Sequence, residues 1–291
     1  SKNLHNREIY YPRGKVLGGS GSINAMIYAR GLPSDFKNWH LSKDWTWENI
    51  KNTYDQIECE VNDNTNRLPS NKIPVNDVSN QHHPILKNFF DASQDFDFTF
   101  NKQLESSIEN QVGNYNVNIF RGFRTSSSKV FLKPIKNNPN LTILTKAEVL
   151  KLNYENKKIV SLNIKHKNKI IIVKPRIGTI LSSGSIMTPY LLLRSGIGNA
   201  TDLKKHNIPV NLHSPNVGKN FQDHLGLDYL YKTFTKTLNK DLGTWSGRIK
   251  SFLRYLYNRS GPLALSLNQG GGYINWIPLI HIRIFNYILI L

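Results

Sequence analysis

The chain has 291 residues, of which 39% are hydrophobic and 11% aromatic, enough for the core of one large or two ordinary domains. Its single cysteine, Cys59, excludes an internal disulfide and a cysteine-rich metal site. The formal net charge of +18 raises nucleic acid or an anionic membrane as a partner. Because the lysines are scattered among asparagines, we expect no nucleic-acid binding and leave membrane association open.

The first informative segment is a glycine-rich loop, Gly14–Gly31, with three glycines and two serines at positions 18–22. Glycine lacks a Cβ, so such a backbone can approach a ligand closely. Its N–H groups can converge on an anion such as a pyrophosphate, as in many loops that hold nucleotide cofactors. On glycine content alone, an ordinary surface loop remains an equal alternative.

Apolar residues at helical spacing predict helices over 47–57, around 85–90 and over 249–256. Asp44 or Thr46 is placed to cap the first of these helices. Residues 59–84 are rich in Asn, Asp and Pro, a composition that predicts an extended surface excursion.

From residue 141 the pattern changes to short β-rich runs with polar breaks, which predicts hairpins or a meander. The runs are Leu141–Thr145, Glu148–Tyr154, Lys158–Ile164, Lys169–Lys174 and Gly178–Ser182. A helix is expected from Ser185 to Ser195, ending before Gly196. The strand over 178–182, a Ser-Gly-Ser turn and this helix would then form a βα unit.

Several familiar motifs are absent from the sequence. Gly19–Asn24 and Gly196–Thr201 both miss the last glycine of the dinucleotide-binding fingerprint. The chain has no P-loop and no Gly-x-Ser-x-Gly. The nine histidines show no spacing typical of a metal site, and for Asp223-His224 we favour a structural or cofactor-edge role over a catalytic dyad.

The two ends of the chain are unusual. The first residue is Ser and no signal peptide is visible, which favours a cytoplasmic location. Residues 275–291 are very apolar but shorter than the ~20 residues that a membrane span needs. Three interpretations of this segment are open: a buried strand or helix, a membrane-associated tail, and the wrong continuation of an interrupted reading frame. We favour the third.

Three segments together resemble the glucose–methanol–choline (GMC) oxidoreductases, flavoenzymes that oxidise alcohols. The loop Gly14–Asn24, continuing to Gly31, is similar to the first family signature, and Gly184–Gly198 is similar to the second. Asn216–His224 is similar to a recurring family segment, with Phe221 in place of the usual Leu. The order of these segments along the chain and the distances between them also agree with the family, so the resemblance spans residues 9 to about 274.

The resemblance implies an α/β fold: an incomplete FAD/NAD(P)-binding-type domain with an interleaved α+β substrate domain. The expected FAD-binding segments are 1–75 and 141–228, and the expected substrate-domain segments are 76–140 and 229–291. Arg259–Leu263 and Asn268–Ile274 look more like the choline and alcohol dehydrogenase branch than the fungal oxidases. We expect an enzyme segment that lacks both ends of the family, with exposed sheet edges and marginal stability.

The resemblance further implies FAD as the cofactor, with hydride transfer from an alcohol carbon to the flavin. The expected partners are a small alcohol substrate and an electron acceptor. The family's catalytic histidine has no match, so no catalytic residue is assigned, and the alternative is a truncated, non-catalytic flavin-binding or interaction module. Val149 matches the family's adenine contact, with an ordinary strand core residue as the alternative. The residues implied to bind FAD are Val16, Gly18, Gly19, Ser20, Asn24, Ala25, Met26, Ile27 and Val149.

Overall fold

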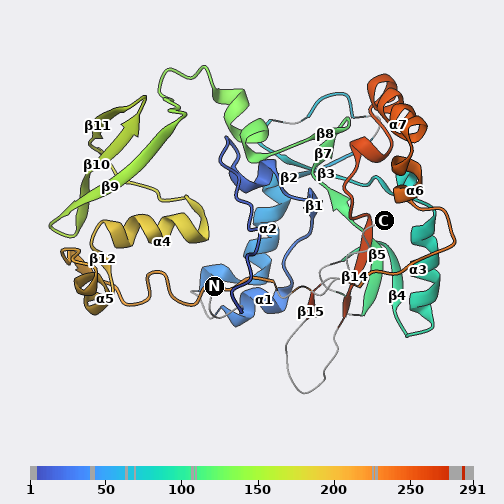
Figure 1. The fold of residues 1–291 in the computed structure, drawn as a ribbon, viewed down its shortest axis with the longest axis horizontal. Helices are drawn as coiled ribbons and strands as arrows, with labels where there is room; N and C mark the ends of the chain where they lie inside the picture. Colours follow the sequence, from blue (N-terminus) through green and yellow to red (C-terminus); the bar gives the residue numbers. More distant parts are fainter. Residues whose placement is uncertain are drawn as a thin grey trace. The chain divides into compact units, whose positions relative to one another are not determined.

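The computed structural model describes residues 5–39, 43–62, 65–68, 70–105, 108, 110–224, 226, 229–274 and 284–285. The chain forms two compact units, the first from residues 1–141 with 232–291 and the second from residues 142–231. Both units mix helices and strands, as expected for the α/β class (Figure 1). Apart from residues 284–285, the apolar segment 275–291 lies outside the described residues.

The first unit contains two four-stranded sheets. One has the order β1-β6-β3-β2, and the other has the order β15-β14-β5-β4. Each combines parallel and antiparallel neighbours: β2 runs parallel to β3, and β4 runs parallel to β5. The strands are β1 (Ile27–Tyr28), β2 (Glu58–Val61), β3 (Ile73–Asn76), β4 (Thr99–Gln103), β5 (Gln111–Asn114), β6 (Asn116–Val117), β14 (Gly270–Ile274) and β15 (Ile284–Phe285), with the small hairpin β7 (Ile119–Phe120) and β8 (Phe123–Arg124).

The helices of the first unit begin at identifiable caps. Thr46 caps α2, because its hydroxyl accepts a hydrogen bond from the Asn49 N–H at 3.3 Å, which confirms one of the two predicted caps. In α1, Pro33 is the first helical residue and Asp35 accepts from the backbone N–H of Leu32 at 2.7 Å. The helices are α1 (Pro33–Asn38), α2 (Trp47–Ile57), α3 (Ile85–Gln94), α6 (Leu238–Gly243) and α7 (Trp245–Asn258).

Two apolar clusters lie in the first unit. One joins Leu86 and Phe90 of α3 to Val112 of β5. The other joins residues from three separate stretches of the chain, which are Val78, Val117 with Ile119, and Leu265, and Met26 packs against them. The second cluster therefore anchors the glycine-rich loop at Met26. No helix in the described part of the chain has the length and apolar content needed to cross a membrane.

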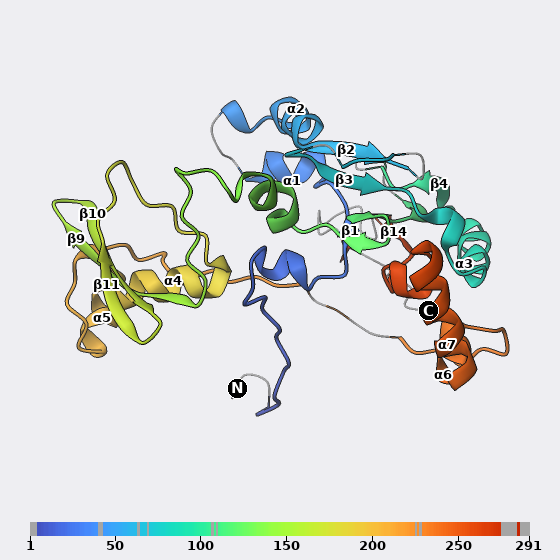
Figure 2. The same cartoon turned by 90° about the horizontal axis from the view of Figure 1, so that it is seen from above.

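The second unit is built around an antiparallel meander, as predicted. Its order is β11-β10-β9, and α4 packs beside β9 (Figure 2). Both connections are two-residue turns with positive φ at each residue, Asn156–Lys157 and Lys167–Asn168, the geometry that matches the twist of the paired strands. The elements are β9 (Ala147–Glu155), β10 (Lys158–His166), β11 (Lys169–Val173), α4 (Gly184–Arg194), α5 (Ala200–Lys205) and the parallel pair β12 (Ile197–Gly198) and β13 (Leu212–His213).

Three predictions about local structure are wrong. Residues 59–84 are no surface excursion, because they contain most of β2 and all of β3, with Pro74 fully buried. Residues 141–145 and 178–182 form no strand. A strand needs a hydrogen-bonding neighbour, and among the described residues neither stretch pairs with one, so no βα unit precedes α4.

Candidate cofactor-binding site

The candidate site is built on residues 14–27, which we call the cofactor loop. Its centre is a short 3₁₀ turn, η2 (Gly19–Ser22), closed by hydrogen bonds from the N–H groups of Ile23 and Asn24 to the carbonyl of Ser20 at 3.1 and 2.9 Å. The start of the loop folds back on this turn, because the Gly14 N–H donates to the Ser20 hydroxyl at 3.2 Å. A Cβ at Gly14 would lie 2.2 Å from the Gly19 carbonyl oxygen, so only glycine fits there.

The tip of the cofactor loop presents bare backbone to open space. Gly19 has a φ of +56°, the left-handed conformation that suits glycine. A Cβ added at Gly19 or at Gly21 would meet no heavy atom within 4 Å. The space beside the backbone is therefore not filled by this chain's described residues. An extended phosphate- or ribityl-bearing cofactor fits such a surface, because it needs close backbone approach and N–H donors.

The side-chain amide of Asn24 has a fixed orientation. Its Oδ1 accepts from the backbone N–H of Met26 at 3.1 Å and from Nη1 of Arg124 at 2.7 Å. Arg124 also donates to the Gly21 carbonyl at 3.4 Å. Burial lowers the pKa of Arg124, but a guanidinium remains charged and has only donors, so the atom facing it must be the amide oxygen. Asn24 therefore keeps its NH₂ group, a double donor, for a ligand.

The end of the cofactor loop is anchored in the core of the first unit. Met26 has a φ of +64°, and its carbonyl accepts from the Asn118 N–H at 2.8 Å. Its side chain packs against the cluster containing Val117, which is also the strand partner of Ile27. The transition from loop to β1 is thus held by both backbone and side-chain contacts.

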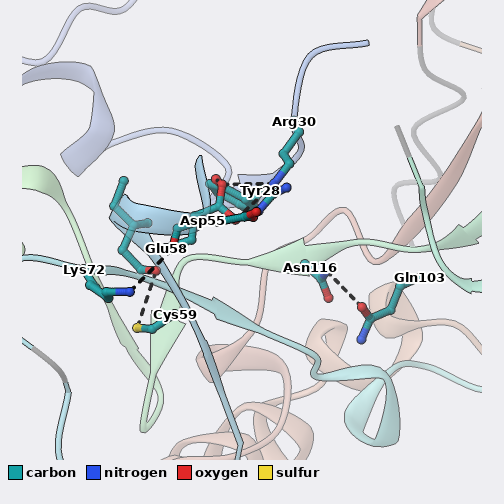
Figure 3. A network of polar contacts seen from close by, with 9 residues as sticks. Tyr28, Arg30, Asp55, Glu58, Cys59, Lys72, Gln103 and Asn116 are labelled. Carbon is teal, nitrogen blue, oxygen red and sulfur yellow. Dashed lines mark hydrogen bonds and ion pairs between the residues drawn. The ribbon is translucent and has the colours of Figure 1, made fainter. Parts of the chain in front are cut away.

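A polar network continues this anchor beyond the loop (Figure 3). Glu58 accepts from the Tyr28 hydroxyl and from the Arg30 guanidinium, whose Nη2 lies 2.6 Å from Oε2 of Glu58. The same Nη2 donates to Asp55 at 2.7 Å, and the Arg30 guanidinium lies over the ring of Tyr54 at 5.1 Å. Burial raises the pKa of Glu58 to about 7.

The network forms one wall of a cavity of about 550 Å³ within the first unit. Its lining includes Tyr28, Arg30, Glu58, Gln103 and Tyr273. Because Tyr28 and Arg30 follow directly after the cofactor loop, their contacts tie the end of the loop to α2 and β2. Sequence reasoning missed both Arg124 and the Arg30–Glu58 pair, since these contacts join residues 100 and 28 positions apart and no local pattern signals them.

The structure brings together eight of the nine residues predicted to bind the cofactor. All eight belong to the cofactor loop, where Val16 and Ala25 are exposed and Ile27 is half-buried. The ninth, Val149, lies on β9 of the second unit, where it is half-buried opposite Ile164 of β10. Its place in a cofactor site stays a prediction.

The fold belongs to the α/β class, and comparison with known proteins gives the family. Residues 2–226 match the family model described as GMC oxidoreductase, so the chain belongs to the GMC oxidoreductase family, as its sequence motifs predicted. The chain is 32% identical over 284 residues to an alcohol dehydrogenase [acceptor] from Pseudomonas putida, covering 95% of this chain and 51% of the relative. It is 29% identical over 282 residues to an oxygen-dependent choline dehydrogenase from Staphylococcus aureus, covering 94% of this chain and 48% of that relative. The chain thus spans about half the length of the curated relatives it matches.

Solved structures agree with the fold. A pyridoxine 4-oxidase from Mesorbium loti has 27% identity and a TM-score of 0.64, over 70% of this chain and 41% of that one. An FAD-dependent oxidoreductase from Chaetomium thermophilum has 22% identity and a TM-score of 0.80, over 93% and 50%. A formate oxidase from Aspergillus oryzae, described for its FAD modification, has 23% identity and a TM-score of 0.76, over 90% and 48%. Membership of the GMC oxidoreductase family supports FAD, the cofactor expected from the sequence.

Proposed function

We propose that this chain supplies the cofactor loop of an FAD site in an oxidoreductase that acts on the CH–OH group of an alcohol or of choline. The observation that carries the proposal is the loop itself, whose backbone at Gly19 and Gly21 faces open space and whose Asn24 amide is oriented to donate. Membership of the GMC oxidoreductase family gives the reaction class, and the alcohol and choline dehydrogenases among its relatives suggest the substrate class.

In this proposal the backbone of Gly18, Gly19 and Ser20 approaches the middle of FAD, and the N–H groups of Gly18 and Ser20 donate hydrogen bonds to it. The Gly19 N–H already donates to the Val16 carbonyl at 2.9 Å, so Gly19 contributes close approach only. The Asn24 NH₂ group donates to a polar atom of the ribityl or flavin portion. The remaining residues of the predicted set provide apolar contact, and these are Val16, Ala25, Met26 and Ile27 along the loop and Val149 beside the adenine.

Bound FAD supplies the hydride acceptor, while the alcohol carbon loses the hydride and its hydroxyl loses a proton to a base. We assign that base to no residue of this chain. The contribution of the chain is binding and orientation: the Arg124 guanidinium holds Asn24, and the core contacts of Met26 hold the end of the loop. We accordingly expect the chain by itself to oxidise no alcohol.

A titration of the 291-residue chain with FAD, followed by flavin fluorescence, tests the proposal. Gly19→Asn is the informative variant, because Asn adopts the left-handed conformation of Gly19 and its side chain would enter the open space. We expect FAD affinity to fall at least about ten-fold, or ~1.4 kcal/mol, with little change in melting temperature.

Gly243→Asn is the matched control, since a Cβ added at Gly243 would also meet no heavy atom within 4 Å, but this glycine lies at the end of α6. It should leave FAD affinity unchanged. Equal FAD affinity of the chain and of Gly19→Asn would refute the proposal, as would a chain that binds no FAD.

A further inference from the structure

Helix α7 presents its large apolar side chains outward. Residues at spacings of four, seven, eight and eleven from Trp245 share one face of the helix, and each of the five is between 50% and 78% exposed. These residues, which we call the α7 apolar face, are Trp245, Ile249, Phe252, Leu253 and Leu256.

The opposite face of α7 packs against the rest of the first unit. A Cβ at Gly247 would lie 1.7 Å from the Asp241 carbonyl oxygen of α6, so the two helices lie in backbone contact (Figure 1). One turn on, Ser251 is buried, and after another turn the Tyr255 hydroxyl donates to the Gly122 carbonyl at 3.3 Å. Small and polar residues thus face the protein while the apolar residues face away, the reverse of an ordinary surface helix.

Cations flank the α7 apolar face on both sides. At 100° per residue, Arg248 lies on one flank of the face and Lys250 lies on the other. The sequence contains no Asp or Glu from residue 242 to residue 291, so no carboxylate of that segment offsets these cations. An aromatic and aliphatic face bordered by Lys and Arg is the pattern of a helix that lies in the plane of a membrane surface.

We propose that the α7 apolar face docks on an anionic phospholipid surface, with Arg248 and Lys250 at the level of the phosphate headgroups. Charge decides between this occupant and a second copy of the chain. Two copies paired through this face would bring the same cations together, within a chain of net charge +18. An anionic lipid surface meets both the apolar and the cationic parts of the helix. This inference is independent of FAD binding.

Sedimentation of the full 291-residue chain with phospholipid vesicles tests the inference. We expect the chain to partition onto phosphatidylcholine vesicles that contain phosphatidylglycerol, and much less onto phosphatidylcholine alone. The double variant Phe252→Ser/Leu253→Ser should lower the partition coefficient by at least about ten-fold, because it removes two large apolar groups from the membrane contact. Lys250→Gln should lower it about five-fold, the equivalent of about 1 kcal/mol per cation near an anionic surface.

The matched control is Ile170→Ser/Ile172→Ser on β11, whose two side chains are 66% and 65% exposed. This variant loses similar apolar surface elsewhere and should bind vesicles as the unmodified chain does. A second readout does not depend on the folding of these variants: lipids with brominated acyl chains should quench tryptophan fluorescence, and Trp245→Phe should remove that component.

Four results would overturn the inference. They are failure to bind anionic vesicles, equal binding to neutral vesicles, equal loss of binding in the β11 control, and a dimer in solution that the Phe252→Ser/Leu253→Ser variant dissociates. The last result would assign the α7 apolar face to a second copy of the chain.

Discussion

Replacing Asn24 by Asp separates the two roles that the structure gives this side chain. Oδ1 of Asn24 accepts hydrogen bonds from Arg124 and from the Met26 N–H. An aspartate keeps both acceptor contacts, because it has the same shape and two acceptor oxygens. It loses the NH₂ group and places a negative charge where a donor stood.

The two roles should respond in opposite directions. The hydrogen bond from the charged Arg124 guanidinium becomes an ion pair, which strengthens it. Asn24 is exposed, so the gain in the free energy of unfolding stays below about 1 kcal/mol. On the cofactor side, one hydrogen bond is lost and the facing acceptor is left unpaired, which together cost about 2 kcal/mol, or ~30-fold in FAD affinity.

The assay combines thermal unfolding with a fluorescence titration of FAD on the same preparations. We expect Asn24→Asp to unfold at the same temperature or slightly higher and to bind FAD much more weakly. Asn24→Ala, which loses both roles, should be weaker in both measurements. An Asn24→Asp chain that binds FAD as tightly as the unmodified chain would refute the assigned orientation of the amide.

Two further predictions concern stability. The buried Ser195 hydroxyl accepts from the Leu152 N–H at 2.9 Å and donates to the Leu191 carbonyl at 2.6 Å. Ser195→Ala should therefore lower the free energy of unfolding by about 1–3 kcal/mol, measured by denaturation. Ser182→Ala at an exposed position is the control and should change this free energy little. Burial lowers the pKa of His82 despite its contact with Asn114, so the unfolded chain binds the proton more readily than the folded chain does. The free energy of unfolding should therefore fall as the pH drops below about 6.5. Denaturant titrations of His82→Gln should show a smaller fall, and an equal fall would contradict this assignment.

The sequence predicted those elements whose signal is local. The helices α2, α3 and α7 follow from apolar spacing, and the meander follows from alternating strands joined by short polar turns. The two hairpin turns need only two residues each, so their geometry is also a local property. The family motifs also placed eight of the nine predicted cofactor-binding residues in one continuous loop, and their role stays a prediction.

Elements that depend on distant partners could not be predicted in this way. The strands β2 and β3 are short and lie within Asn- and Pro-rich sequence, and it is pairing across the sheet, with β6 beside β3, that makes them strands. Residues 178–182 show the converse, since their composition favours a strand while the described chain offers no neighbour. The orientation of Asn24 depends on Arg124, 100 residues away, and only the folded chain reveals it.

Hydrogen–deuterium exchange of the chain with and without FAD tests the central claim most directly. If the cofactor loop binds FAD, the backbone amides from Gly18 to Met26 should exchange more slowly when FAD is present, and so should the β9 amides around Val149 if that residue contacts the adenine. The meander connection at Asn156–Lys157 serves as an internal control and should exchange at the same rate in both conditions. Unchanged exchange throughout the cofactor loop at saturating FAD would contradict the assignment of this loop to the cofactor.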